Sequence, residues 1–149
     1  MSAQVLIAVL LGLAATAEDL WRRNISNWIP LSALLAGFLW HVSQQGWSGV
    51  LTAAVGAGAG FLIFLVFYLL GGMGGGDVKL MAGFGALLGL SRLIEAALWT
   101  AIIGAVLAAL VIAASSLRRW VRKDAAQKPL AIPYAPAITA GVWLSLVPR

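Results

Sequence analysis

Long apolar stretches separated by short polar gaps constrain this chain more than any other feature of its sequence. Hydrophobic residues make up 62% of its 149 residues and charged residues only 10%, whereas a soluble domain carries about 25% charged residues. Lipid-exposed segments must satisfy their own backbone hydrogen bonds, and no stretch shows the polar alternation of a barrel strand. We therefore expect an all-α polytopic membrane protein with six transmembrane helices, over residues 3–18, 28–42, 50–70, 78–91, 93–117 and 131–147.

The basic residues predict how such a bundle is oriented. Eight of the ten Lys and Arg residues fall in alternate gaps, or within two residues of one, if all six stretches span the membrane. Because cytoplasmic loops are enriched in Lys and Arg, we expect these gaps to face the cytoplasm and both termini to face the other side. The longest gap, residues 118–130, is expected to be a cytoplasmic basic loop that contacts anionic lipids. The eight residues are Arg22, Arg23, Lys79, Arg118, Arg119, Arg122, Lys123 and Lys128.

The composition also excludes several classes of function. The chain has no cysteine, which excludes a structural disulfide, a thiol nucleophile and any cysteine-based metal site. Its one histidine, His41, is expected to be a polar residue at the outer interface, and one histidine cannot build a zinc site. The net charge is +5, but the basic residues lie between apolar stretches, where they set the orientation of the helices in the membrane. No nucleic-acid partner is therefore expected.

The N-terminal stretch VLIAVLLGLAATA, residues 5–17, allows a second interpretation. It resembles the apolar part of a secretory signal, with Ala15 and Ala17 in the cleavage positions. The preceding residues MSAQ carry no positive charge, and removal of the stretch would spoil the alternation of basic gaps. We therefore expect it to be the first membrane span.

Two carboxylates stand out among the five acidic residues. Placing an ionisable group at membrane depth costs free energy. A carboxylate at the end of a span that faces other helices is therefore a candidate functional residue. Asp19 directly follows the first stretch and Asp77 directly precedes the fourth, so the topology alone places both at the cytoplasmic boundary. Glu18 neighbours Asp19, but adjacent helical residues point about 100° apart. Only one of these two is expected to face the interior.

If Asp19 and Asp77 meet laterally, their chemistry is that of an acid–base pair. Like charges close together cannot both ionise cheaply, so the pair shares one proton. The ionised partner can deprotonate a water while the protonated partner polarises a peptide carbonyl, as in aspartic proteolysis. Five glycines within residues 71–76 precede Asp77 and are expected to let the backbone approach an extended peptide.

The same two carboxylates also suit other classes of protein. A small proton-coupled transporter or channel subunit would use Asp19 and Asp77 as a proton relay, with the glycines interrupting a helix. A non-catalytic assembly factor with the same fold is a third hypothesis. The sequence lacks a clear inverted repeat, which favours the protease over the transporter.

Two segments that contain these aspartates resemble the type IV prepilin peptidases, a family of intramembrane aspartyl proteases. GGGDVKL, residues 74–80, is similar to the GxGD signature, and DLWRRNISN, residues 19–27, is similar to the first catalytic segment. Ser26 stands where proline is usual. The residues that match the family patterns are Gly74, Gly76, Asp77, Lys79, Asp19, Arg23, Ile25 and Asn27.

A third segment, IPYAPAITAG at residues 132–141, resembles the start of the last helix in these enzymes through Pro133 and Pro136. The resemblance implies one transmembrane peptidase domain over residues 1–149 that removes the leader of prepilins or pseudopilins at the cytoplasmic face of the bacterial inner membrane. It assigns catalysis to Asp19 and Asp77 without metal or cofactor. The other matching residues are assigned to the motif and to substrate binding.

Larger members of the family carry an additional N-terminal cytoplasmic domain with two CxxC pairs and also methylate the new N-terminus. This sequence has no cysteine, so it resembles the compact form associated with Flp/Tad-type pili, which lacks the N-terminal zinc domain. We expect it to be a prepilin leader peptidase and leave methylation, the particular pilin and the oligomeric state open.

Overall fold

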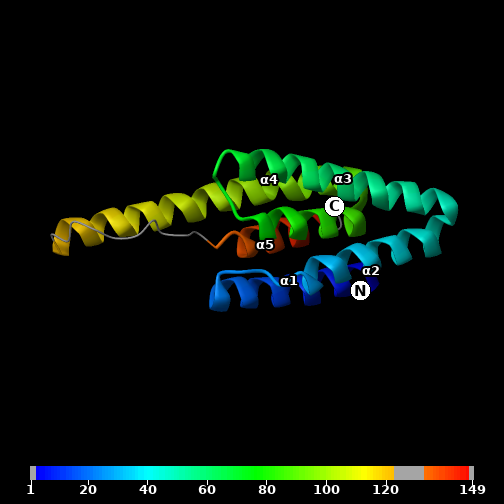
Figure 1. Cartoon of the computed structure of the whole chain (residues 1–149), viewed down its shortest axis with the longest axis horizontal. Helices are drawn as coiled ribbons and strands as arrows, with labels where there is room; N and C mark the ends of the chain where they lie inside the picture. Colours follow the sequence, from blue (N-terminus) through cyan, green and yellow to red (C-terminus); the bar gives the residue numbers. More distant parts are fainter. Residues whose placement is uncertain (1–2, 123–132, 148–149) are drawn as a thin grey trace.

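The computed structural model describes residues 3–122 and 133–147, with side chains described for residues 3–116 and 133–147. Every regular element in this part of the chain is an α-helix, which confirms the predicted all-α fold (Figure 1). The elements are α1 (Ala3–Arg22), α2 (Trp28–Gln45), α3 (Trp47–Leu69), α4 (Gly75–Arg122) and α5 (Ala135–Ser145).

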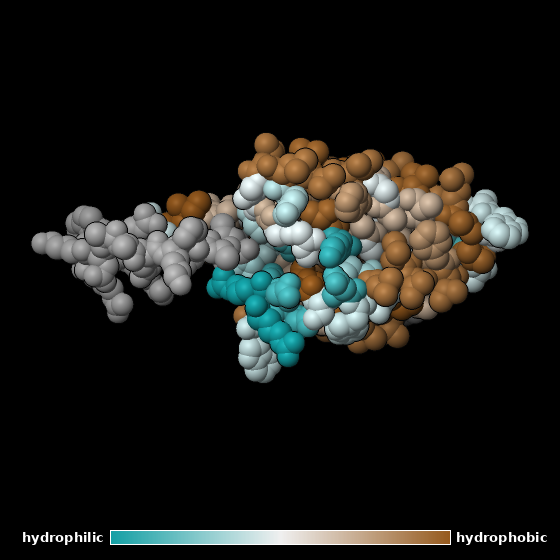
Figure 2. Space-filling view, in the orientation of Figure 1, coloured by the Kyte–Doolittle hydropathy of each residue, from teal (hydrophilic) through white to brown (hydrophobic). Residues whose placement is uncertain are grey.

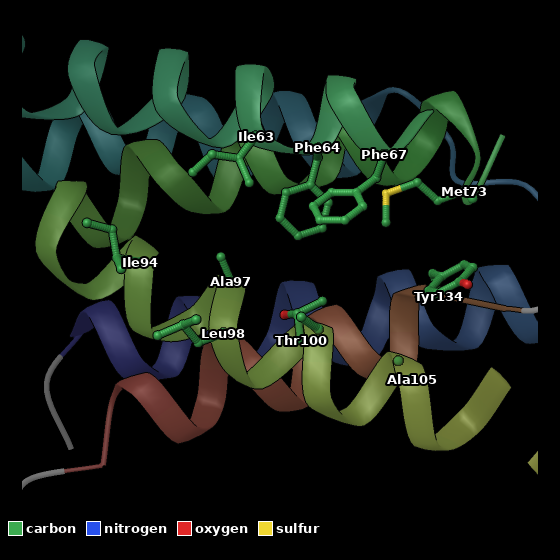
Figure 3. Close-up of a pocket in the computed structure, with 13 residues that line it drawn as sticks. Ile63, Phe64, Phe67, Met73, Ile94, Ala97, Leu98, Thr100, Ala105 and Tyr134 are labelled. Atoms are coloured by element: carbon green, nitrogen blue, oxygen red, sulfur yellow. The ribbon is translucent and has the colours of Figure 1, made fainter. Parts of the chain in front are cut away.

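Helix α4 contains the fourth and fifth predicted stretches, joined at Gly89. This residue has φ 72° and ψ 170°, which are not helical values, and glycine adopts positive φ without a steric penalty. The chain reverses direction there, so the two halves of α4 run antiparallel (Figures 1 and 3). The predicted break near residue 92 was therefore three residues too late. The side-chain amide (Nε2) of Gln4 donates a 2.7 Å hydrogen bond to the backbone carbonyl of Leu87, beside this break.

Alternating helix directions bring distant segments together at one end of the bundle. Helices α1 and α3 end there and α2, α4 and α5 begin there (Figure 1). We call this the basic end, because Arg22, Arg23 and Lys79 lie on it. Polar side chains gather there, whereas most of the remaining surface in this view is apolar (Figure 2). The start of α1 and the end of α5 lie at the opposite end.

Several predicted boundaries were wrong by a few residues. Helix α1 continues to Arg22, four residues beyond the predicted end, so Asp19 lies within its last turn. Helix α4 continues to Arg122, because RRWVR contains no glycine or proline to stop it. The first five residues of the predicted loop 118–130 are therefore helical, and the rest of that loop lies outside the described residues. Helix α5 spans only 11 residues.

Three helices of the described chain are long and apolar enough to cross a membrane: Ala3–Arg22, Trp47–Leu69 and Gly75–Ser116, the last of which contains both halves of α4. Large apolar side chains also cover the outside of the bundle, including Leu39, which is 72% exposed, and Leu51, which is 67% exposed. Such a surface is stable in lipid and unfavourable in water. A membrane-embedded protein is therefore confirmed, whereas the count of six spans stays a prediction.

Helices α3 and α4 approach closely through glycines. A Cβ atom added at Gly56 would overlap the carbonyl of Gly85, and one added at Gly60 would lie 2.5 Å from the carbonyl of Met81. Close backbone approach of this kind is how membrane helices gain packing energy. His41 is buried rather than interfacial, because its ring packs against Gly89 at the reversal.

Replacing Gly56 with alanine should destabilise the bundle, because overpacking against a backbone costs about 1–3 kcal/mol. Gly58→Ala on the same helix is the matched control, since a Cβ there meets nothing within 4 Å. The midpoint of thermal unfolding in detergent should fall for Gly56→Ala and stay unchanged or rise for Gly58→Ala. Equal midpoints would contradict the close contact between α3 and α4.

Candidate active site

Asp19 lies in the last turn of α1 and faces the interior of the bundle. It is 8% exposed, whereas the next residue, Leu20, is 59% exposed. The backbone amide of Ala135 donates a 3.1 Å hydrogen bond to Oδ2 of Asp19. Because Ala135 is the first residue of α5, its amide has no partner within that helix, and the positive end of the helix dipole favours a carboxylate.

Hydrogen bonds between α1 and α5 fix this arrangement along the helices. Oγ1 of Thr139 donates to the carbonyl of Gly12 over 3.1 Å, and Nε1 of Trp143 donates to the carbonyl of Ala8 over 3.3 Å. A Cβ added at Gly12 would lie 2.6 Å from the methyl group of Thr139. The start of α5 is therefore held against the end of α1, where Asp19 lies.

Asp77 lies in the first turn of α4 and is 7% exposed. The backbone amide of Gly74 donates a 3.1 Å hydrogen bond to Oδ2 of Asp77. Gly74 directly precedes the helix and Asp77 is its third residue, so this is the carboxylate half of a capping box. The sequence therefore folds locally so that a carboxylate occupies the N-terminus of α4.

The structure brings the two aspartates together at the basic end. The carboxyl groups of Asp19 and Asp77 lie within electrostatic range of each other. Each accepts a backbone amide from a helix start, α5 for Asp19 and α4 for Asp77. Both carboxylates singled out in the sequence therefore lie nearly buried at the same end of the bundle.

The turn between α1 and α2 packs directly on Gly76, the glycine before Asp77. A Cβ added at Gly76 would lie 3.2 Å from Cβ of Ile25, so a larger residue there would push the turn away. Gly74 has no such constraint, since its nearest neighbour would be Oδ2 of Asp77 at 3.5 Å. Arg23 directly follows α1 and has φ 52°, an uncommon value for a non-glycine residue.

Glu18 holds this turn, a role that the sequence reasoning missed. Its carboxylate accepts the amide of Ser26 at 2.8 Å and also the Ser26 hydroxyl. The prediction that only one of Glu18 and Asp19 faces the interior is confirmed, because Glu18 is only partly buried. The sequence held one signal for this role of Glu18: Ser26, eight residues later, replaces the proline that is usual at this position. A hydrogen-bonded serine restrains the turn where proline would restrain it covalently.

Other predicted site residues line a polar pocket beside Asp77. Nζ of Lys79 donates a 3.1 Å hydrogen bond to Oδ1 of Asn27, which joins α4 to the start of α2. The pocket has a volume of about 430 Å³. Arg23 is not among its lining residues and lies instead within electrostatic range of Asp19. The lining residues are Asn24, Ile25, Ser26, Asn27, Gly76 and Lys79.

Pro133 and Pro136 do not line this pocket; Pro133 lies two residues before α5 and Pro136 lies in its first turn. Pro136 is its second residue, a position where the missing amide costs no helical hydrogen bond. Both prolines are partly buried. They flank Ala135, so they restrain the backbone whose amide contacts Asp19. The contact of Ala135 with Asp19 was not predicted, because a backbone donor leaves no side-chain pattern in the sequence.

Glu18→Ala should loosen the turn between α1 and α2, because it removes both hydrogen bonds to Ser26. A bond to a charged group contributes about 1.5–3 kcal/mol, which corresponds to roughly tenfold or greater acceleration of local amide exchange. Hydrogen exchange at Ser26 measures this directly. Glu95→Ala, at an exposed site on α4, is the control and should leave the rate unchanged. Equal exchange in the two variants would show that Glu18 does not restrain the turn.

The sequence that contains both aspartates is similar to that of known proteins. A model of the type IV leader peptidase family matches residues 5–109, which include both aspartates. The chain is also similar to the Prepilin leader peptidase/N-methyltransferase of Bacillus subtilis (strain 168), with 39% identity over 93 residues. That match covers 61% of this chain and 34% of the relative, so the chain matches about a third of the relative's length. No solved structure matches the chain.

The family match confirms the resemblance inferred from the sequence and favours a protease over a transporter. It contains the segments 19–27 and 74–80, whereas the segment 132–141 lies outside the matched residues. It also covers most of α1, all of α2 and α3, and most of α4. This chain therefore belongs to the type IV leader peptidase family.

Proposed function

We propose that this chain is an intramembrane aspartyl endopeptidase that removes the leader peptide of type IV prepilins. The observation that carries the proposal is that Asp19 and Asp77 lie at the basic end within electrostatic range of each other, each bonded to the amide of a helix start. Family membership and the similarity to a prepilin leader peptidase support the substrate class. The finer assignment, to Flp-type prepilins or pseudopilins, rests on the sequence resemblance.

In the proposed reaction a water lies between the two carboxyl groups. The ionised carboxylate takes a proton from this water as its oxygen forms a bond to the scissile carbonyl carbon. The protonated carboxyl group donates a hydrogen bond to the carbonyl oxygen, which carries negative charge in the tetrahedral intermediate. Collapse of the intermediate breaks the C–N bond, and the leaving nitrogen takes the proton from the carboxyl group that captured it. The scheme uses Asp19, Asp77 and one water.

The polar pocket beside Asp77 is the proposed site for the polar part of the substrate. Its lining places Asn27 and Lys79 next to Gly76, at the start of the helix that carries Asp77. Gly71 has φ 76° and open space around its Cα, so the loop before α4 presents backbone to an extended peptide. Arg23, Gly74, Pro133 and Pro136 act in the proposal by holding the two aspartates in position.

We further propose that the protein crosses the bacterial inner membrane six times and contacts its lipids. Both halves of α4 count as spans in this arrangement. The basic end faces the cytoplasm, because Arg22, Arg23 and Lys79 lie there and cytoplasmic ends attract basic residues. Both termini then face the opposite side. Cleavage takes place at the cytoplasmic face, where the leader of a newly made prepilin is accessible.

Asp19→Asn and Asp77→Asn should each lower the rate of prepilin cleavage by roughly 10³-fold or more, because members of a catalytic unit fail together. The assay is conversion of a co-expressed prepilin to its mature form. Glu95→Gln removes an exposed carboxylate from α4 and should cleave like the wild type. Full cleavage by either aspartate variant would refute the assignment of Asp19 and Asp77 as the catalytic pair.

The proposed orientation predicts which single cysteines a membrane-impermeant thiol reagent can reach. The chain has no native cysteine, so each label reports one position. Gln44→Cys lies at the end opposite to the basic end and should react in intact spheroplasts, whereas Asn24→Cys should react only after lysis. Both positions are exposed in the structure. The reverse labelling pattern would overturn the orientation.

A further inference from the structure

An apolar groove of about 420 Å³ runs between α3 and the second half of α4 (Figure 3). Ile63, Phe64 and Phe67 form one wall, from α3, and the α4 wall runs from Ile94 to Ala105. Leu98, on the α4 side, is 62% exposed, so the groove opens on the apolar surface that faces lipid. None of these residues contributes to the acid pair or to the polar pocket.

One end of the groove leads to the candidate active site. Met73 and Tyr134 lie at this end, with Ile94 towards the other (Figure 3). Met73 directly precedes Gly74, whose amide contacts Asp77. Tyr134 directly precedes Ala135, whose amide contacts Asp19. The groove is therefore continuous with both backbone segments that hold the aspartates.

The α4 wall has the dimensions and the surface of a helix-packing site. Ile94 and Ala105 are 11 residues apart, which corresponds to roughly 17 Å or about three helical turns. Ala97, Ala101 and Ala105 recur at four-residue intervals along the groove. Small residues at this spacing let two membrane helices approach closely. Ala101 and Ala105 are exposed, so no described segment of this chain covers them.

We propose that the groove seats an apolar transmembrane helix of the substrate, adjacent in the substrate sequence to the bond that is cut. This inference rests on the proposed peptidase function and adds where the substrate is held. The start of α4 then separates two binding regions, because Met73 lines the apolar groove while Gly76 and Lys79 line the polar pocket. A substrate with an apolar helix next to a polar segment places the junction between them at Asp19 and Asp77.

Filling the groove should block the substrate without touching the acid pair. Ala101→Trp should slow cleavage of a full-length prepilin in liposomes at least about tenfold, because the indole occupies the space of the substrate helix. Ala54→Trp is the matched control, since Ala54 is exposed on α3 and does not line the groove, and its rate should stay within about twofold of wild type. An unchanged rate for Ala101→Trp would overturn the inference, as expected if only lipid chains fill the groove.

Cross-linking tests the same contact with a smaller substitution. In the Asp77→Asn background, Ala101→Cys should form a disulfide with a prepilin that carries one cysteine in its apolar segment, and Ala54→Cys should not. The absence of native cysteine makes each product specific. A wild-type protein that fails to cleave the prepilin would refute the proposed function itself. Normal wild-type cleavage with no cross-link at Ala101 would refute the groove alone.

Discussion

The arrangement depends on two buried carboxylates that each accept a backbone amide from the start of a helix. A carboxylate inside an apolar bundle is costly unless it is hydrogen-bonded, and helix N-termini supply unpaired amides together with a favourable dipole. Asp77 finds this partner in its own helix, through Gly74. Asp19 finds it in α5, through Ala135. The site therefore requires that α1 end where α4 and α5 begin.

Glycine packing and the reversal at Gly89 satisfy this requirement. The break divides α4 into antiparallel halves, so the chain returns to the end of the bundle where α4 began. Helix α5 begins at that same end. Gly56 and Gly85 bring the backbones of α3 and α4 into contact, which fixes the position of the helix that carries Asp77. Membrane helices gain little from hydrophobic association with one another, so this close contact contributes much of their packing energy.

Local hydrogen bonds then position the surroundings of the pair. Glu18 restrains the turn after α1 through Ser26, and this turn packs on Gly76 just before Asp77. The bond from Lys79 to Asn27 joins the same turn to α4 from its other side. Glu18, next to the proposed catalytic Asp19, thus has a structural role. Its carboxylate holds Ser26, which stands where proline is usual in the family.

The sequence by itself determined the apolar helices, the alternation of basic gaps and the common depth of Asp19 and Asp77, because these follow from hydropathy and helix length along one chain. It also located the motif residues Gly76, Lys79 and Asn27. Only the tertiary structure decided that the two carboxyl groups lie within electrostatic range, that Ala135 contacts Asp19 and that a groove between α3 and α4 leads to the site. Lateral neighbours in a bundle are set by the packing of whole helix faces, and backbone donors carry no side-chain signature, so neither can be read from spacing along the sequence.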